Sequence, residues 1–405
     1  MKMYPFVRKG LVAGIVLLFI GTVVIPSSGQ KIEKPSLPMS GSNTLYVGGS
    51  GPGNYTKIQD AIDNASDGDT VFVYDDSSPY SEYNISINKS IELIGENKNT
   101  TIIDEGNGVY GTKILKISAD DVKVTGFSIV DSQGVYSDTG IYIEGDVGKQ
   151  NVIRTVSNVN ISGNIFVNTS TAIYETKTHN SMISDNLITS KCFTEGPNTP
   201  IIVGIDLEHA LNSTIRGNTI LYAYNSGIHT DFSHCFIEDN FISYVVQPMN
   251  QYGISQGSSC NRIIGNKITN ETIGIVSGTS SNVISQNNIS CCDWFGIVLA
   301  KPSRFNIISN NNISECKHYG IALCRTFCTI VKENNFIRNN ISAFFMSSFM
   351  TRWVHNYWDN WSGKGPKRIN GIFVTHRADW WFDILGIPCY NFDWFPASKP
   401  YNILG

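Results

Sequence analysis

Three carboxylates and one histidine stand at matching places in the middle of the chain. Asp206 and Glu208 follow a Gly-Ile dipeptide at residues 204–205, and His229 and Asp231 follow a second Gly-Ile dipeptide at the same offsets. Paired carboxylates act as general acid and general base in glycoside hydrolysis. Closely spaced carboxylates can also hold a divalent cation, next to which a histidine can accept a proton. The four residues are therefore candidate catalytic residues, a divalent cation is an open alternative, and no other cofactor is indicated.

Two short phrases repeat along the chain and set the spacing of these residues. The first is a hydrophobic residue followed, three positions later, by an asparagine, which recurs at Asn164, Asn186, Asn218, Asn240, Asn266, Asn287, Asn311, Asn334 and Asn356. The second is Gly-Ile, which begins at Gly140, Gly204, Gly227, Gly253, Gly274, Gly296 and Gly320. Ala172-Ile173 and Ala343-Phe344 fill the two remaining places. A period of about 22 to 24 residues is too short for helical-pair repeats and lacks the leucine-rich consensus.

The segments between these phrases alternate Ile or Val with polar residues, which is the periodicity of a β-strand. Each period holds about three such segments. A coil of three short strands that stacks in parallel on the next coil satisfies the backbone hydrogen bonds, with about 4.8 Å between coils. Asparagine suits the recurring turn because it tolerates the left-handed conformation, and stacked asparagines can bond to one another as a ladder. The sequence therefore predicts an all-β parallel solenoid.

Strand alternation predicts which side chains of each coil face outward. The isoleucine after each glycine points inward, and the next outward positions hold, coil after coil, Tyr142 and Glu144, Tyr174 and Thr176, Asp206 and Glu208, and His229 and Asp231. Residues at the same position in adjacent coils should lie about 5 Å apart. The carboxylates and the histidine would then share one patch, with three candidate substrate-binding residues beside them, namely Tyr142, Tyr174 and Glu144.

Three insertions fall in the coils that carry this patch. They lie between Gly140 and Asn164, between Asn186 and Gly204, and between Asn240 and Gly253. Such loops, among them TSKCFTEGPNTP at residues 189–200, could wall a groove beside the patch. The alternative interpretation is a solvated polar face without a function. The nearby residues His234, Glu238 and Asp239 are expected in exposed turns with no functional role.

The chain resembles the right-handed parallel β-helix proteins of the pectin-lyase-like superfamily, and most of all the exported NosD-type family. The resemblance rests on YTKIQDAIDNASDGDTVFVY (residues 55–74), HNYWDNWSG (355–363) and IPCYNFDWFPASKPY (387–401). It implies a β-helix over residues 44–350 with an N-terminal capping helix within about residues 50–75. It also implies an aromatic C-terminal cap or tail over residues 351–405, where six of the seven tryptophans lie.

The N-terminus is typical of an export signal. Lys2, Arg8 and Lys9 precede the uncharged run Leu11–Ile25, which is short for a spanning helix and suits a signal sequence. Residues 1–29 are therefore predicted to be a signal peptide or, if uncleaved, a membrane anchor and the protein's contact with a membrane. Residues 30–43 are predicted to be a linker. The protein is expected to be extracellular or on the cell surface.

The composition and the patch together favour a carbohydrate partner. A net charge of −4 with 16% charged residues argues against a nucleic-acid-binding protein, which normally has a basic face. The first interpretation is a protein that binds polysaccharide or surface glycans, because the patch comes without a complete catalytic motif. The alternative is a polysaccharide lyase or glycoside hydrolase that uses the patch. The NosD resemblance implies a third role, as a copper-site accessory protein, although no Met-rich or His-pair copper motif is present.

Overall fold

The computed structural model describes residues 43–105, 111–131, 139–145, 154–189, 203–223, 225–231, 234–243, 251–374 and 386–403. The predicted export signal, nearly all of the predicted linker and most of the residues in the three insertions lie outside these ranges. Within them, no helix is both long and apolar enough to cross a membrane.

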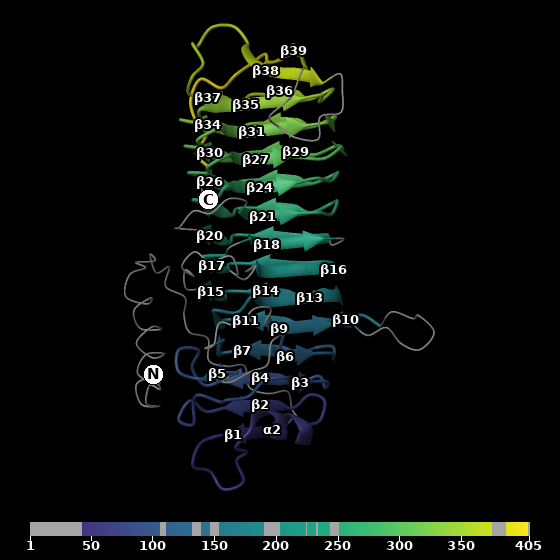
Figure 1. Ribbon diagram of the computed structural model, residues 1–405, viewed down its shortest axis with the longest axis vertical. Helices are drawn as coiled ribbons and strands as arrows, with labels where there is room; N and C mark the ends of the chain where they lie inside the picture. The colour runs from purple at the N-terminus through teal and green to yellow at the C-terminus, as the bar shows by residue number, and fades with distance from the viewer. Residues whose placement is uncertain are drawn as a thin grey trace.

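The chain winds into about 12 turns of a parallel β-solenoid, in which each turn lies directly on the previous one (Figure 1). One column of strands carries the Gly-Ile phrases and consists of β3 (Ile85–Ile87), β6 (Lys113–Ile117), β9 (Thr139–Glu144), β13 (Thr171–His179), β16 (Val203–Arg216), β18 (Ser226–Asp231), β21 (Tyr252–Gln256), β24 (Ile273–Ser277), β27 (Phe295–Leu299), β31 (Tyr319–Cys324), β35 (Ile341–Met346) and β38 (Lys367–Val374).

Two further columns complete each turn. The second consists of β1 (Thr44–Val47), β2 (Thr70–Val73), β4 (Glu92–Gly95), β7 (Lys123–Thr125), β11 (Asn160–Ser162), β14 (Met182–Ser184), the end of β16, β19 (His234–Glu238), β22 (Arg262–Ile264), β25 (Val283–Ser285), β29 (Ile307–Ser309), β33 (Ile330–Lys332), β36 (Arg352–Val354) and β39 (Gly386–Asp393). The third consists of β5 (Ile102–Asp104), β8 (Ser128–Val130), β12 (Ile165–Val167), β15 (Leu187–Thr189), β17 (Thr219–Leu221), β20 (Phe241–Ser243), β23 (Lys267–Thr269), β26 (Asn288–Ser290), β30 (Asn312–Ser314), β34 (Asn335–Ile337) and β37 (Tyr357–Trp358).

Three short strands and one helix complete the described elements. Strand β10 (Val156–Ser157) pairs with β13, and β28 (Ser303–Arg304) pairs with β32 (Thr326–Phe327) at a corner of the late coils. Helix α2 (Ile58–Asn64) lies at one end of the solenoid and the antiparallel pair β38–β39 lies at the other (Figure 1). The helix buries Ile58, Ala61 and Ile62, the three residues that the sequence places on one helical face.

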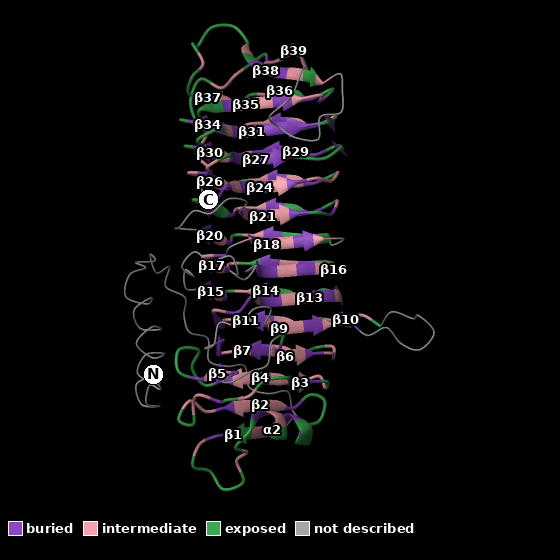
Figure 2. Cartoon of the chain, in the orientation of Figure 1, coloured by how far each residue is buried: buried purple, intermediate pink, exposed green. Residues whose placement is uncertain are grey.

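The core is a stack of isoleucines along the axis of the solenoid. The isoleucine of each Gly-Ile or Ala-Ile phrase is fully buried from β9 to β31. The residue after it is partly exposed from β9 to β24 and buried in β27 and β31, and Figure 2 shows buried and intermediate segments along these strands. Removing each such side chain from water contributes roughly 1.5 to 3 kcal/mol to folding. The glycine is needed for space, because a Cβ on Gly227 would lie 2.5 Å from Cγ2 of Ile242 and 2.7 Å from the carbonyl oxygen of Gly253. The repeat phrase therefore encodes close packing between coils.

One coil departs from the predicted register. Ala343 was expected at the glycine position and Phe344 at the isoleucine position. Instead, Ala343 pairs with Ile321, and a Cβ on Gly320 would approach the carbonyl oxygen of Ser342. Ser342 therefore takes the place of the glycine, and the expected alignment of this coil was wrong by one residue. Phe344 faces outward as a result, beside Ala322.

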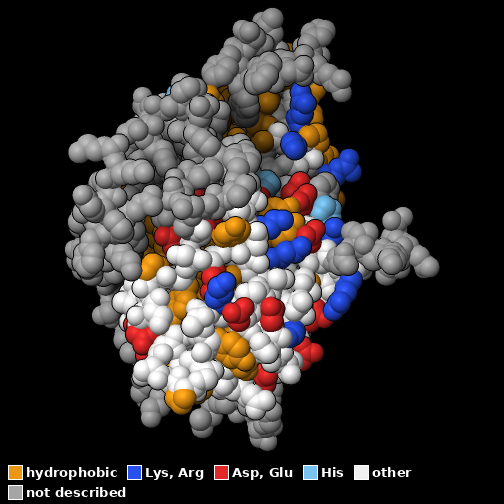
Figure 3. Space-filling view, turned by 60° about the horizontal axis from the view of Figure 1, so that its bottom comes forward, with side chains coloured by type: hydrophobic (Ala, Val, Ile, Leu, Met, Phe, Trp, Pro, Cys, Tyr) orange, Lys and Arg blue, Asp and Glu red, His pale blue; other side chains and the backbone are white. Residues whose placement is uncertain are grey.

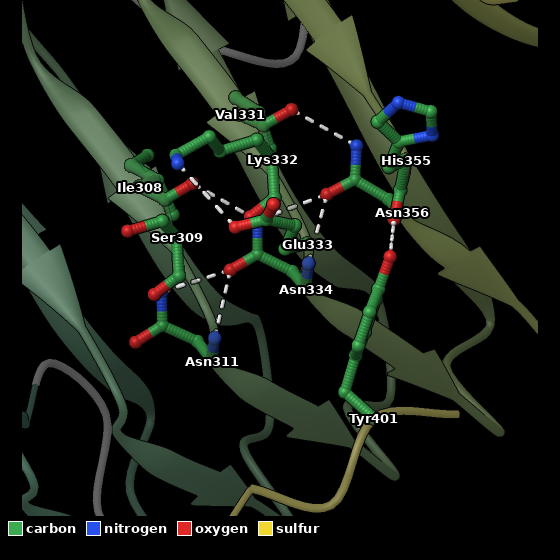
Figure 4. A network of polar contacts seen from close by, with 10 residues as sticks. All are labelled: Ile308, Ser309, Asn311, Val331, Lys332, Glu333, Asn334, His355, Asn356 and Tyr401. Atoms are coloured by element: carbon green, nitrogen blue, oxygen red, sulfur yellow. Dashed lines mark hydrogen bonds and ion pairs between the residues drawn. The ribbon is translucent and has the colours of Figure 1, made fainter. Parts of the chain in front are cut away.

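The predicted asparagine ladder is confirmed. All nine asparagines are buried, and from Asn164 to Asn334 each side-chain amide donates a hydrogen bond to Oδ1 of the next one, at distances of 2.9 to 3.3 Å. Figure 4 shows the end of the ladder, where Asn311, Asn334 and Asn356 lie one above another. At its end, the buried carboxylate of Asp393 on β39 accepts a hydrogen bond from Nδ2 of Asn356 at 3.1 Å. The ladder satisfies buried polar groups in every coil that it crosses.

Candidate functional site

The column of Gly-Ile strands brings the candidate residues together in two adjacent rows. In the first row, parallel pairing places Tyr142 beside Tyr174, Tyr174 beside Asp206, and Asp206 beside His229. The second row pairs Glu144 with Thr176, Thr176 with Glu208, and Glu208 with Asp231. We name the polar patch the set of Tyr142, Glu144, Tyr174, Asp206, Glu208, His229 and Asp231. All seven side chains are partly exposed, so the structure places them as the alternation predicts, while their function stays a prediction.

Direct contacts hold the two tyrosines of the polar patch in place. The hydroxyl of Tyr174 donates a short hydrogen bond to the carboxylate of Glu208. The rings of Tyr142 and Tyr174 are stacked, with centroids 5.2 Å apart and planes 8° from parallel. Nζ of Lys113 lies 3.9 Å from the centroid of the Tyr142 ring on β9. Neighbouring groups therefore lie against the ring faces, and the tyrosines present mainly their edges and hydroxyl groups.

Two lysines on β6 border the patch and were missed in the sequence interpretation. Besides the contact of Lys113 with Tyr142, Nζ of Lys116 lies 3.6 Å from the carboxylate of Glu144. Lys116 pairs in register with Tyr142. Because it occupies the same outward position one coil earlier, the alternation rule extended backwards would have identified it. The visible face in Figure 3 shows acidic and basic side chains lying close together with histidine.

The electrostatics single out Asp206. Burial raises its pKa above the usual range of a carboxyl group, and the negative charges of Glu208 and Asp231 raise it further, against the opposing effect of His229. The tyrosine pKa values also rise, in both cases mainly through burial: that of Tyr142 reaches about 12, with Glu144 adding to the shift, and that of Tyr174 is raised further by its bond to Glu208. Asp206 thus retains a proton to higher pH than an exposed carboxyl, as a general acid requires.

A buried glutamate lies directly behind the polar patch. Glu175 stands between Tyr174 and Thr176 on β13 and points into the core, where it is fully buried. Burial raises its pKa, while the nearby hydroxyls of Ser181 and Thr178 act in the opposite direction. Its oxygens have no hydrogen-bond partner in standard geometry. The sequence interpretation missed this residue, although a charged residue at an inward position of the alternation is a detectable signal.

Other candidates fall in different places. His234 and Glu238 were expected in turns, and this was wrong: they begin and end strand β19, with His234 exposed and Glu238 partly buried. Asp239 is exposed, as expected, and its carboxylate lies 3.2 Å from the guanidinium of Arg216. Residues 189–200 were expected to wall a groove beside the patch. Except for Thr189, these residues lie outside the described ranges. Among the described residues, no group of three or more His, Cys, Asp or Glu side chains is arranged to hold a metal ion.

Comparisons with known proteins agree with this architecture. Residues 203–379 match the family model described as a right handed beta helix region. No curated protein sequence matches the chain. The DFA-IIIase of Arthrobacter chlorophenolicus A6 without its lid superposes with a TM-score of 0.56 at 13% identity, covering 78% of this chain and 94% of that one. The same enzyme in complex with GF2 gives a TM-score of 0.54 at 12% identity, covering 78% and 94%.

A phage protein shares the same winding. Tailspike protein 3 of bacteriophage CBA120 superposes with a TM-score of 0.53 at 11% identity, covering 78% of this chain and 58% of that one. At such low identity these likenesses concern the fold alone. They do not distinguish the NosD-type family from other β-helix proteins. The repeat, the inward isoleucines and the matched family model together support a right-handed parallel β-helix fold for this chain.

Proposed function

We propose that this protein binds a glycan across the polar patch on strands β9, β13, β16 and β18. The observation that carries the proposal is the in-register pairing of Asp206 with His229 and of Glu208 with Asp231. It sets carboxylate oxygens in two rows on a flat face, about 4.8 Å apart along the axis. Carboxylates accept hydrogen bonds from sugar hydroxyl groups, and such charge-assisted bonds are stronger than neutral ones. The β-helix fold of DFA-IIIase, which has been solved in complex with GF2 and with DFA-III, supports a carbohydrate ligand at the level of fold.

Hydrogen bonding rather than ring stacking would hold the glycan. The faces of Tyr142 and Tyr174 lie against each other and the Lys113 ammonium group lies against the Tyr142 ring. A sugar ring would therefore meet tyrosine edges and hydroxyls beside the carboxylates. The geometry favours a ligand with several hydroxyl groups, whose polar atoms can reach both rows at once.

The binding prediction is tested by removing charge without changing shape. We expect the double variant Asp206→Asn, Glu208→Gln to weaken binding to a glycan identified on an array by at least about tenfold, because two charge-assisted acceptors are replaced by neutral amides. Calorimetry measures the change. The matched control is Glu238→Gln. Glu238 lies in the same turn of the solenoid as Asp231 but on β19, in another column of strands. An array without ligands, or equal affinity in the double variant and the control, would argue against the site.

A second candidate, hydrolysis of the bound glycan, is favoured by the raised pKa of Asp206. In this reaction Asp206 would protonate the departing glycosidic oxygen, and Glu208 or Asp231 would activate water. We expect cleavage to fall as the pH rises through the pKa of Asp206, because only the protonated acid can donate. Assays of reducing ends across a pH series measure this, and Asp206→Asn should abolish product. Binding without any product in the unmodified protein would leave glycan binding as the function.

A further inference from the structure

Five large apolar side chains lie exposed in a row along one corner of the last coils. We name this row, consisting of Phe305, Phe327, Phe349, Met350 and Phe373, the phenylalanine ridge. The exposed fraction of these side chains runs from 38% for Phe327 to 67% for Met350. Phe327 and Phe349 are bridge partners in adjacent coils, and the ring centroids of Phe349 and Phe373 lie 5.6 Å apart. A continuous exposed apolar row of this kind is typical of an interaction site.

Strand alternation sends Phe327 outward. In β28 and β32, Ser303 and Thr326 are buried, so their neighbours Arg304 and Phe327 face solvent as paired residues. The backbone conformation at the corner does not require an aromatic side chain. The backbone of Phe305 is left-handed there, with φ of 57°.

Equivalent corners of earlier coils carry small side chains. The hydrogen bonds between turns align Phe305 with Ser281 and Cys260 below it and with Cys328 and Met350 above it. All five residues have the same left-handed backbone, with φ between 53° and 65°. Because serine and cysteine serve the same corner equally well, the large apolar residues of the late coils are not required by the fold.

Cationic side chains flank the phenylalanine ridge. Lys301, Arg304, Arg325 and Arg352 are exposed, and within the described part of the chain none of them forms an ion pair with a carboxylate. The guanidinium of Arg304 lies 6.0 Å from the centroid of the Phe327 ring. The three corner segments, residues 300–310, 322–332 and 344–354, contain no Asp or Glu. The corner thus combines exposed apolar groups with unneutralised positive charge on a protein that is negative overall.

We propose that the phenylalanine ridge docks onto the surface of an anionic lipid bilayer. Phe and Met carry no hydroxyl or N–H group, so they suit a hydrocarbon environment better than a sugar or a hydrated polar surface. The arginines and the lysine beside them fit the phosphate groups of anionic lipids. A convex corner fits a deformable bilayer surface, whereas a stable protein partner would need a broad complementary face. This surface is separate from the polar patch and does not depend on its function.

Two cysteines provide a footprint of the docked surface in the full-length chain. Cys328 stands in the ridge between Phe305 and Met350, while Cys260 holds the equivalent corner outside the ridge, and both are free thiols. We expect vesicles containing phosphatidylglycerol and phosphatidylcholine to slow labelling of Cys328 by a membrane-impermeant maleimide at least about fivefold. Labelling of Cys260, followed by mass spectrometry in the same sample, should stay unchanged. Because the readout is local, it reports on this corner whatever the N-terminal segment does.

Substitutions separate the two parts of the proposal. The pair Arg304→Gln, Arg325→Gln should raise the lipid concentration needed to protect Cys328 by about 25-fold, since each arginine contributes about fivefold. Phe305→Ser with Met350→Ser should also weaken the protection, whereas Tyr83→Ser, an exposed tyrosine in the early coils, should not. Three results would overturn the proposal: equal labelling of Cys328 with and without anionic vesicles, equal protection by phosphatidylcholine alone, or protection without vesicles that grows with protein concentration. The last result would indicate a second copy of the chain as the partner.

Discussion

Replacing Asp393 with alanine is expected to lower the free energy of unfolding by about 4 kcal/mol. This carboxylate is fully buried and accepts hydrogen bonds from N and Nδ2 of Asn356 and from Nε1 of Trp358, at 2.9 to 3.2 Å. It also accepts the backbone N–H groups of His355 and Phe395. Alanine leaves these donors without an acceptor at the end of the asparagine ladder, and a buried donor without a partner is costly. Urea unfolding followed by circular dichroism measures the change.

A graded series sharpens this prediction. Asp393→Asn keeps one acceptor oxygen and should cost less than Asp393→Ala. Asp359→Ala, which removes an exposed carboxylate near the same end of the solenoid, is the control and should change stability little. If Asp393→Ala were no more destabilising than Asp359→Ala, Asp393 would not be needed to terminate the ladder.

The second large effect is a gain of stability. Glu175→Gln is expected to stabilise the protein at neutral pH, because the glutamate is buried without a partner in standard geometry and its pKa is raised, mainly by burial. In the unfolded chain Glu175 ionises near its ordinary pKa of 4.5. The folded protein keeps this proton to higher pH, so the unfolded state binds fewer protons and stability falls as the pH rises. The slope is about 1.4 kcal/mol per pH unit between the two pKa values.

The pH series is the decisive measurement for Glu175. Glutamine has no proton to lose, so the variant should lack this slope, and the two proteins should converge in stability below the ordinary pKa. Glu175→Leu should behave similarly, since Ile143 and Leu207 occupy the same inward position in the adjacent coils. The surface substitution Glu238→Gln should leave the slope in place. A variant that tracks the unmodified protein at every pH would show that Glu175 is not held neutral in the core.

The repeat could be predicted because its determinants are local. The glycine, the following isoleucine and the asparagine each meet the same residue one coil away, so a single period encodes both the register and the inward face. The positions of Asp206 and His229 followed from that register. The predicted alignment of the coil at Ser342 was wrong because this coil has no Gly-Ile phrase to show where its repeat begins.

Other features depend on contacts that the period does not encode. Asp393 meets Asn356 from 37 residues away, out of phase with the repeat, and no motif marks it. Raised pKa values depend on how deeply each group is buried, which the period does not encode. Asp206 and Glu175 lie on adjacent coils, and only the strand alternation distinguishes them, because it points Asp206 outward and Glu175 inward. The phenylalanine ridge was missed because Phe305, Phe349 and Met350 lie between strands, where sequence patterns normally predict only solvent exposure.

The asparagine ladder has a direction as well as a length. Every side-chain amide points its N–H toward the C-terminal end of the solenoid, so the amide dipoles add head to tail along the interior. The positive end of this array meets the negative charge of Asp393, as an anion meets the N-terminus of an α-helix. The solenoid is therefore electrically polar along its axis. Further coils could extend it only in the same orientation, with their amide oxygens facing the existing donors.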